Sequence, residues 1–249
     1  MSTKSASLVM LRRDFAHITR NPTSVFNAVL MPVVMLFMFV YLLGGAFSVG
    51  VDYVDYATPG MMLLAVCYGL GATATAANSD MTKGIINRFK VMDVPRGAVL
   101  TGKVVASVLT NLVAIAVLLG VAFALGFRPS ASFVDWLGVV GLVVLLGFAT
   151  AWLTVALGLA AKSPETAGLA SVPLIMLPFF SSAIVPADKM GQGIRQFAEY
   201  QPFTPIIETL RGLLNGAVDT SVAMTAVAWC VGIALVGYLW ARSTFTKRA

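Results

Sequence analysis

Six long runs without Asp, Glu, Lys or Arg restrict what this chain can fold into. Each run has about 20 residues or more, the length that an α-helix needs to cross a membrane. Since the backbone finds no water in the hydrocarbon core, a lone spanning segment of this length folds as a helix. The runs are 25–47, 57–78, 104–127, 136–161, 166–185 and 222–241. The sequence therefore predicts an all-α, polytopic membrane protein with six transmembrane helices.

The few charged residues are unevenly distributed between the two sides of these spans. Charged residues make up 11% of the chain and hydrophobic residues 58%, a balance that argues against a soluble or disordered chain. Thirteen of the 17 Lys and Arg residues fall on the side that holds both chain ends. By the positive-inside rule this predicts a multi-pass protein of the bacterial cytoplasmic membrane with both termini in the cytoplasm. The net charge of +6 then indicates orientation and not a nucleic-acid partner.

Residues 7–21 precede the first span and have the pattern of an amphipathic helix. Apolar residues recur at spacings of three and four, with basic residues mostly on the other side. Such a helix suits the membrane interface, where its basic side chains face anionic lipid head groups. The alternative is a cytoplasmic stub whose charges only set the orientation.

Two further segments between spans are expected to be helical. Residues 79–97 combine apolar and basic residues, which indicates docking to a partner or an interfacial helix without one. Residues 187–216 are expected to form short external helices, with Glu208 and Arg211 pairing as a structural i, i+3 pair. The prolines expected to kink or break the fifth span are Pro173, Pro178 and Pro186.

Chemistry that needs ionisable residues is missing from the six runs. They contain no Asp or Glu, and the single histidine, His17, lies outside them, so no catalytic residue and no metal site is expected. Residues 97–104 resemble a phosphate-binding loop, but Val104 replaces the Ser or Thr that would bind magnesium. Cys67 and Cys230 are expected to be packing residues. We therefore expect no enzyme activity and no cofactor in this chain, and an energy source outside it.

The order of these segments resembles the permease subunits of ABC-2 type exporters, above all the daunorubicin/doxorubicin-resistance drug-efflux permeases. Those permeases begin with a basic helix that ends near Arg-x-Pro, matched by RNP at 20–22. After the second span they have D-R-E-x-G-T-x-E-R-L, where residues 80–89 are DMTKGIINRF. Later they have N-P-x-T and E-x-x-R, matched by QPFT at 201–204 and ETLR at 208–211. The residues that depart from the family pattern are Thr82, Ile85 and Asn87.

This resemblance, which covers about 11–242, implies a single transmembrane domain over 1–249 and a set of partners. A second permease chain forms a homodimer with the first, and two cytoplasmic ATPase subunits bind ATP and Mg. Segment 79–97 corresponds to the coupling helix that fits a cleft in the ATPase. The residues implied in this coupling are Asp80, Lys83, Gly84, Asn87, Arg88, Phe89 and Arg96. Those implied in the interface helix are Arg12, Arg13, Phe15 and Arg20.

The implied substrate path runs between two permease chains, along the first, second and fifth spans. Aromatic, Met and hydroxyl side chains there suit a hydrophobic or amphiphilic small molecule, such as a drug or natural product. The residues are Phe37, Tyr68, Thr73, Asn78, Met176, Phe179, Phe180 and Ser181. Ordinary helix packing is the alternative for each of them. Export of a lipid or lipid-linked glycan is the alternative function, and a membrane enzyme or scaffold is a more distant one.

Overall fold

Helices make up nearly all of the chain that the computed structural model describes, which is residues 22–44, 52–82 and 96–248. No strand occurs in these three ranges, so the all-α prediction is confirmed for them. The long helices are α2 (Pro22–Leu43), α3 (Tyr53–Tyr68), α4 (Leu70–Thr82), α6 (Arg96–Ala124), α7 (Phe133–Ala160) and α12 (Thr220–Arg248). The short ones are α8 (Pro164–Ala170), α9 (Val172–Met176), η1 (Leu177–Phe180), η2 (Ala187–Lys189), α10 (Gln192–Tyr200) and α11 (Phe203–Leu214).

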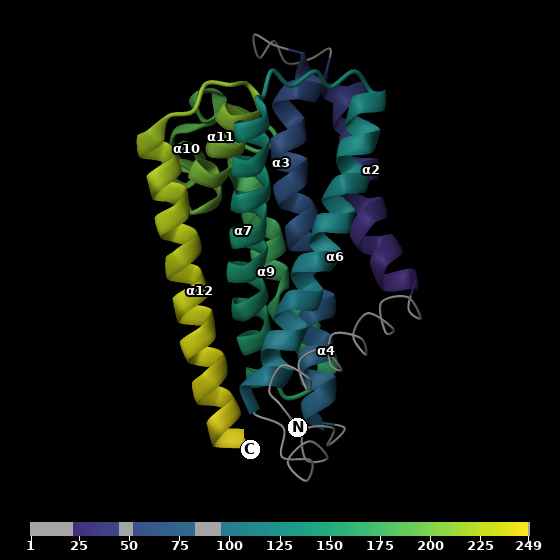
Figure 1. Ribbon diagram of the computed structural model, residues 1–249, viewed down its shortest axis with the longest axis vertical. Helices are drawn as coiled ribbons and strands as arrows, with labels where there is room; N and C mark the ends of the chain where they lie inside the picture. Colours follow the sequence, from purple (N-terminus) through teal and green to yellow (C-terminus); the bar gives the residue numbers. More distant parts are fainter. Residues whose placement is uncertain (1–21, 45–51, 83–95, 249) are drawn as a thin grey trace.

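The long helices run along one axis as a bundle (Figure 1), and α10 and α11 lie together at its upper end. The last turns of α4 and α12 lie at the opposite, lower end. Four stretches are long and apolar enough to cross a membrane, namely 53–82, 100–124, 133–160 and 220–246. Two shorter apolar stretches, 29–42 and 164–180, overlap the first and fifth predicted spans. The structure therefore supports an integral membrane protein, with four of the expected spans at full length.

The fifth predicted span, 166–185, is not one continuous helix. It is divided into α8, α9 and η1, and each of these pieces has a proline in its first turn. Because proline lacks an amide hydrogen and clashes with the preceding turn, it starts a helix more easily than it continues one. The predicted break is thus confirmed. The helical part ends at Phe180, so that 181–185 forms turns instead of a helix end.

The second predicted span is divided at Gly69 into α3 and α4. α3 packs mainly against α2 and α6, whereas α4 packs mainly against α7 and α8. A Cβ atom on Gly69 would lie 2.9 Å from the Asn111 Oδ1 atom of α6. A side chain at this position would therefore crowd α6, which explains why glycine fits the junction.

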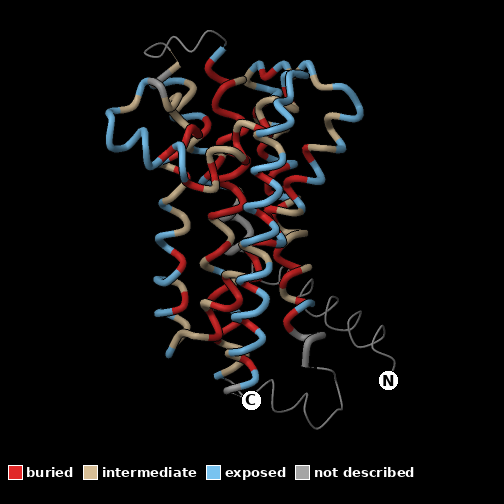
Figure 2. The backbone as a smooth tube through the Cα atoms, turned by 90° about the vertical axis from the view of Figure 1, so that its left-hand side faces the viewer, coloured by how far each residue is buried: buried red, intermediate tan, exposed pale blue. Residues whose placement is uncertain are grey.

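The outward faces of the bundle are apolar, which suits contact with lipid or another chain. Buried residues lie along its interior, and exposed residues follow the outside of the helices (Figure 2). α12 shows this most clearly, because Leu235, Val236 and Leu239 are each more than half exposed. Before its first turn, the Asp219 carboxylate accepts hydrogen bonds from the Ser221 hydroxyl and amide, which lower the pKa of Asp219. This cap marks where the apolar helix begins.

Candidate functional site

The predicted coupling and interface residues lie mostly outside the described ranges. Asp80 is described, and Arg96 begins α6, although its side chain is not described. The others outside the described residues are Arg12, Arg13, Phe15, Arg20, Lys83, Gly84, Asn87, Arg88 and Phe89. The structure therefore leaves the coupling role a prediction and shows only the two helix ends that flank it.

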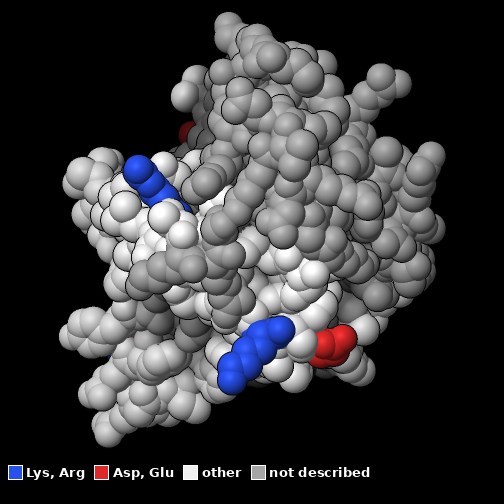
Figure 3. Space-filling model, turned by 90° about the horizontal axis from the view of Figure 1, so that it is seen from below, with Lys and Arg blue, Asp and Glu red and all other residues white. Residues whose placement is uncertain are grey.

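These two helix ends are joined by an ion pair. The Lys103 Nζ atom lies 2.8 Å from an Asp80 carboxylate oxygen, and both side chains are largely shielded from solvent. Lys103 also donates a hydrogen bond to the Ala76 carbonyl at 3.3 Å. Seen from below, the described part of this end shows few charges among uncharged residues (Figure 3). The pair connects the end of α4 with the start of α6, on either side of residues 83–95.

Asn78, predicted to line the substrate path, instead joins two helices. Its side chain is fully buried and its amide nitrogen donates to the Gly158 and Ala161 carbonyls, at 2.9 and 2.8 Å. Gly158 lies in the last turn of α7 and Ala161 is the residue that caps this helix, where side chains commonly bond to backbone carbonyls. Asn78 therefore bonds to the end of α7, and the substrate role of this residue stays a prediction.

The remaining predicted path residues of the first and second spans lie at separate places. Thr73 of α4 lies 3.1 Å from the Ser107 hydroxyl of α6. The Tyr68 hydroxyl donates to the Met35 sulfur atom of α2. Phe37 is exposed on α2 and its ring stacks on that of Tyr41. These residues do not form one cluster within a single chain.

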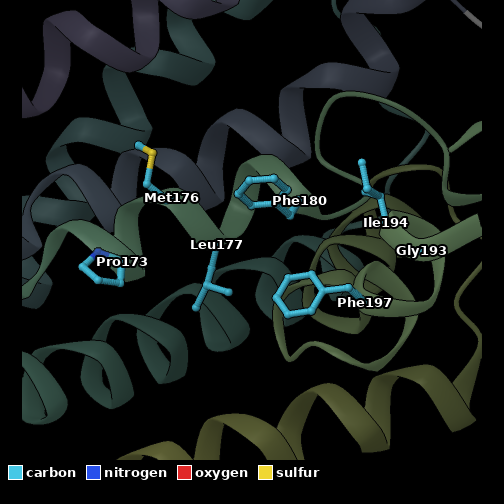
Figure 4. A pocket seen from close by; sticks show the side chains of 7 residues that line it. All are labelled: Pro173, Met176, Leu177, Phe180, Gly193, Ile194 and Phe197. Carbon is cyan, nitrogen blue, oxygen red and sulfur yellow. The ribbon is translucent and has the colours of Figure 1, made fainter. Parts of the chain in front are cut away.

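The fifth-span residues Met176 and Phe180 do come together, in an apolar groove. This groove has a volume of about 530 Å³ and lies between the broken helix and α10. Figure 4 shows its seven lining residues. They are Pro173, Met176, Leu177, Phe180, Gly193, Ile194 and Phe197. None of them is ionisable, so the groove suits an apolar ligand or ligand part.

Two of the lining residues carry aromatic rings that contact each other. Phe180 and Phe197 meet edge to face, with ring centroids 6.3 Å apart. Phe179 instead packs against the core, and Ser181 is buried, so neither lines the groove. Ile194 and Phe197 were missed in the sequence, although their i, i+3 spacing on the short helix Gln192–Tyr200 would have indicated one apolar face. Two of the four predicted fifth-span residues thus lie in the groove.

The described residues thus form a bundle of apolar helices with a broken helix and an apolar groove, which together define a polytopic membrane protein. Among the described residues, no group of three or more His, Cys, Asp or Glu could hold a metal ion. Residues 6–215 match the family described as ABC-2 type transporter, and the chain belongs to this family. The resemblance inferred from the sequence is therefore confirmed.

The curated relatives that match this chain are permeases of the same kind. It is 31% identical over 233 residues to the daunorubicin resistance ABC transporter permease protein DrrB1 of Streptomyces coeruleorubidus. That match covers 93% of this chain and 80% of the relative. It is 25% identical over 238 residues to the probable doxorubicin resistance ABC transporter permease protein DrrC of Mycobacterium tuberculosis, covering 92% and 84%. The chain is thus an ABC-2 permease homologous to permeases of drug-resistance transporters.

Proposed function

We propose that this permease exports hydrophobic or amphiphilic small molecules, such as drugs or natural products, across the cytoplasmic membrane. The observation that carries this proposal is the groove between the broken helix and α10, whose lining has no ionisable residue. An apolar ligand leaves water for such a groove with a gain of about 25 cal/mol per Å² of buried apolar surface. The relatives, which are named as resistance permeases for daunorubicin and doxorubicin, support the same substrate class.

The proposed topology has six spans with both termini in the cytoplasm. α2 and the broken helix α8–η1 provide the two spans in addition to the four long ones. No residue of α9 is buried within this chain, so the broken helix is proposed to face the second permease chain, which would cover its irregular backbone at membrane depth. With this orientation the Asp80–Lys103 pair lies at the cytoplasmic end and the α10–α11 pair at the external end.

The energy is proposed to come from partner subunits. Two cytoplasmic ATPase subunits bind ATP and Mg, and each contacts one copy of a permease homodimer. Residues 79–97 and 7–21 make these contacts. The ion pair between Asp80 and Lys103 supports this assignment, because it joins the two helices that would receive a force from the segment between them.

The experiment is an ATP-driven accumulation assay with daunorubicin as the fluorescent probe. Inside-out vesicles contain this chain together with a cytoplasmic ABC ATPase subunit, and a fluorescent phospholipid is the competing probe. We expect ATP-dependent uptake of daunorubicin that falls several-fold in Phe180→Ala and Phe197→Ala, since both rings line the groove. Phe133→Ala is the control, because this ring is largely exposed at the start of α7.

Three results would contradict parts of this proposal. Transport of the phospholipid without daunorubicin would replace the substrate class. Equal losses in Phe133→Ala and Phe180→Ala would remove the role of the groove. Absence of ATP-dependent uptake of either probe would argue against the export function itself.

A further inference from the structure

The turn that follows the broken helix accepts hydrogen bonds from several side chains. After η1 the chain forms turns over 181–185, where backbone carbonyls lack the partners that a continuous helix would provide. The Ser182 and Ile184 carbonyls of this turn, and the Phe180 carbonyl at the end of η1, accept hydrogen bonds from side chains of other segments. The turn is therefore held by side chains that come from distant parts of the sequence.

Two of these side chains, Tyr56 of α3 and Arg211 of α11, meet at the same carbonyl. The Tyr56 hydroxyl donates to the Ser182 carbonyl at 2.9 Å, and the Arg211 Nη2 atom donates to it at 3.0 Å. The guanidinium carbon of Arg211 also lies 3.9 Å from the centre of the Tyr56 ring. One cation thus contacts α3 through a ring and the turn through a carbonyl, so it joins three segments.

The surroundings of Arg211 favour a strong but reversible contact. Its Nη1 atom pairs with Glu208 one turn away, its side chain is mostly buried, and its Nε atom has no partner. Hydrogen bonds from a charged donor are stronger than neutral ones when water is excluded. In the turn the acceptors of these hydrogen bonds are backbone carbonyls, which can bond to water when the turn moves away from Arg211. Packed helix carbonyls do not have this option.

We infer that Tyr56 and Arg211 form an external latch, which holds the turn 181–185 against α3 and releases it as the transport path opens. This inference rests on the proposed function for its role in transport, although the holding contact can be tested without transport. The groove residue Phe180 immediately precedes the turn, so release of the turn would change the groove as well. The latch is thus a positioning device and not a substrate-binding one.

The holding contact is tested by thiol labelling of a Ser182→Cys variant with N-ethylmaleimide in membranes. Ser182 is buried and its hydroxyl has no partner, so a thiol fits there and is labelled only when the turn opens. Adding Arg211→Gln is expected to raise the labelling rate about tenfold, since a charged donor is lost. Tyr56→Phe removes one hydroxyl and is expected to give a smaller rise. Tyr56→Phe also keeps the test open if the Arg211 variant does not fold.

The matched control is Arg195→Gln, which breaks an i, i+4 ion pair on α10 whose side chains are about half exposed. It is expected to change Ser182→Cys labelling less than twofold. Buried Cys67 of α3 reports general unfolding in the same sample, read by mass spectrometry. Equal rises at Cys67 and Ser182→Cys, or no rise in either variant, would overturn the latch.

Release during transport is tested by adding ATP to vesicles that hold the ATPase as well. Ser182→Cys labelling is expected to rise with ATP. It should stay unchanged with a non-hydrolysable ATP analogue, which does not support turnover. If ATP leaves labelling unchanged while daunorubicin accumulates, the contact holds the turn throughout transport and the proposed release is wrong. Should daunorubicin not accumulate although Arg211→Gln raises labelling, the proposed function fails and the holding contact stands.

Discussion

The two halves of the second long stretch, α3 and α4, follow each other in sequence but are held in different ways. α3 consists largely of bulky apolar residues, and 14 of its 16 residues are buried. α4 has four buried residues and is rich in Ala and Thr. Apolar burial therefore dominates around α3, whereas close backbone approach and polar bonds dominate around α4.

The partners of the two halves also lie at different ends of the bundle. Tyr53 and Tyr56 of α3 reach the turn after the broken helix, near α10 and α11. Asn78 and Thr75 of α4 reach the end of α7 and the start of α8. The difference indicates two rigid groups that meet at Gly69, one joined to the α10–α11 end and the other to the end beside residues 83–95.

The largest expected effect distinguishes two glycines at which an added Cβ atom would make equally close contacts. Gly158 of α7 faces α4, and Gly60 belongs to α3. In Gly158→Ala the new Cβ would lie 2.4 Å from the Ala74 carbonyl oxygen, between two regular helices. We expect a loss of about 2 kcal/mol or more in unfolding free energy, because neither helix backbone can yield locally. In Gly60→Ala the contact is with Ala183 at 2.4 Å, in a turn that can shift, so the loss should be smaller.

The unfolding free energies of both variants are to be measured in mixed detergent micelles. Gly141→Ala is the control on α7, since no heavy atom lies within 4 Å of its new Cβ. It should be neutral or stabilising by up to about 1 kcal/mol, the difference in helix propensity. Equal losses at Gly158 and Gly60 would remove the distinction between a rigid and a yielding contact.

The next effect concerns the polar attachment of α4. Asn78→Leu removes two hydrogen bonds to the end of α7 while keeping the number and branching of the side-chain heavy atoms. We expect a loss of about 1–2 kcal/mol, since buried carbonyls lose a donor and membrane hydrogen bonds are individually modest. Thr82→Val is the control, because the Thr82 hydroxyl bonds only to carbonyls of its own helix. A loss in Thr82→Val as large as that in Asn78→Leu would show that the attachment to α7 is unimportant.

Much of this fold follows from local sequence patterns. The apolar runs predicted the long helices, the prolines predicted the break in the fifth span, and the i, i+3 spacing predicted the pair Glu208–Arg211. All of these features depend on residues near one another in sequence or on a single helix face.

The composition of the site was harder to predict. The hydrogen bonds of Asn78 to carbonyls 80 and 83 residues away, at the end of α7, were not predicted. Tyr56 and Arg211 were not singled out together, although they meet at Ser182. Which polar residue meets which carbonyl depends on how helices rotate against each other, and the hydrophobic pattern of a single helix does not contain that information.

The smallest effect tests the one described hydroxyl pair between α4 and α6. Thr73 and Ser107 lie 3.1 Å apart, and the Thr73 hydroxyl also contacts the Gly69 carbonyl of its own helix. A double-mutant cycle with Thr73→Val and Ser107→Ala is expected to give a coupling energy of about 0.6 kcal/mol, typical of hydrogen bonds between membrane helices. In Ser107→Ala the Thr73 hydroxyl keeps its hydrogen bond to the Gly69 carbonyl. This single variant should therefore lose less unfolding free energy than Thr73→Val.

The size of this coupling decides how the two halves are joined. A value near 0.6 kcal/mol leaves α4 attached to α6 more weakly than to α7, so that α4 can move with α7 and α8 about Gly69. A coupling energy larger than the loss expected for Asn78→Leu would instead mean that α4 is firmly attached to α6, which also packs on α3. The second stretch would then behave as one rigid helix, and the distinction between its halves would be only one of composition.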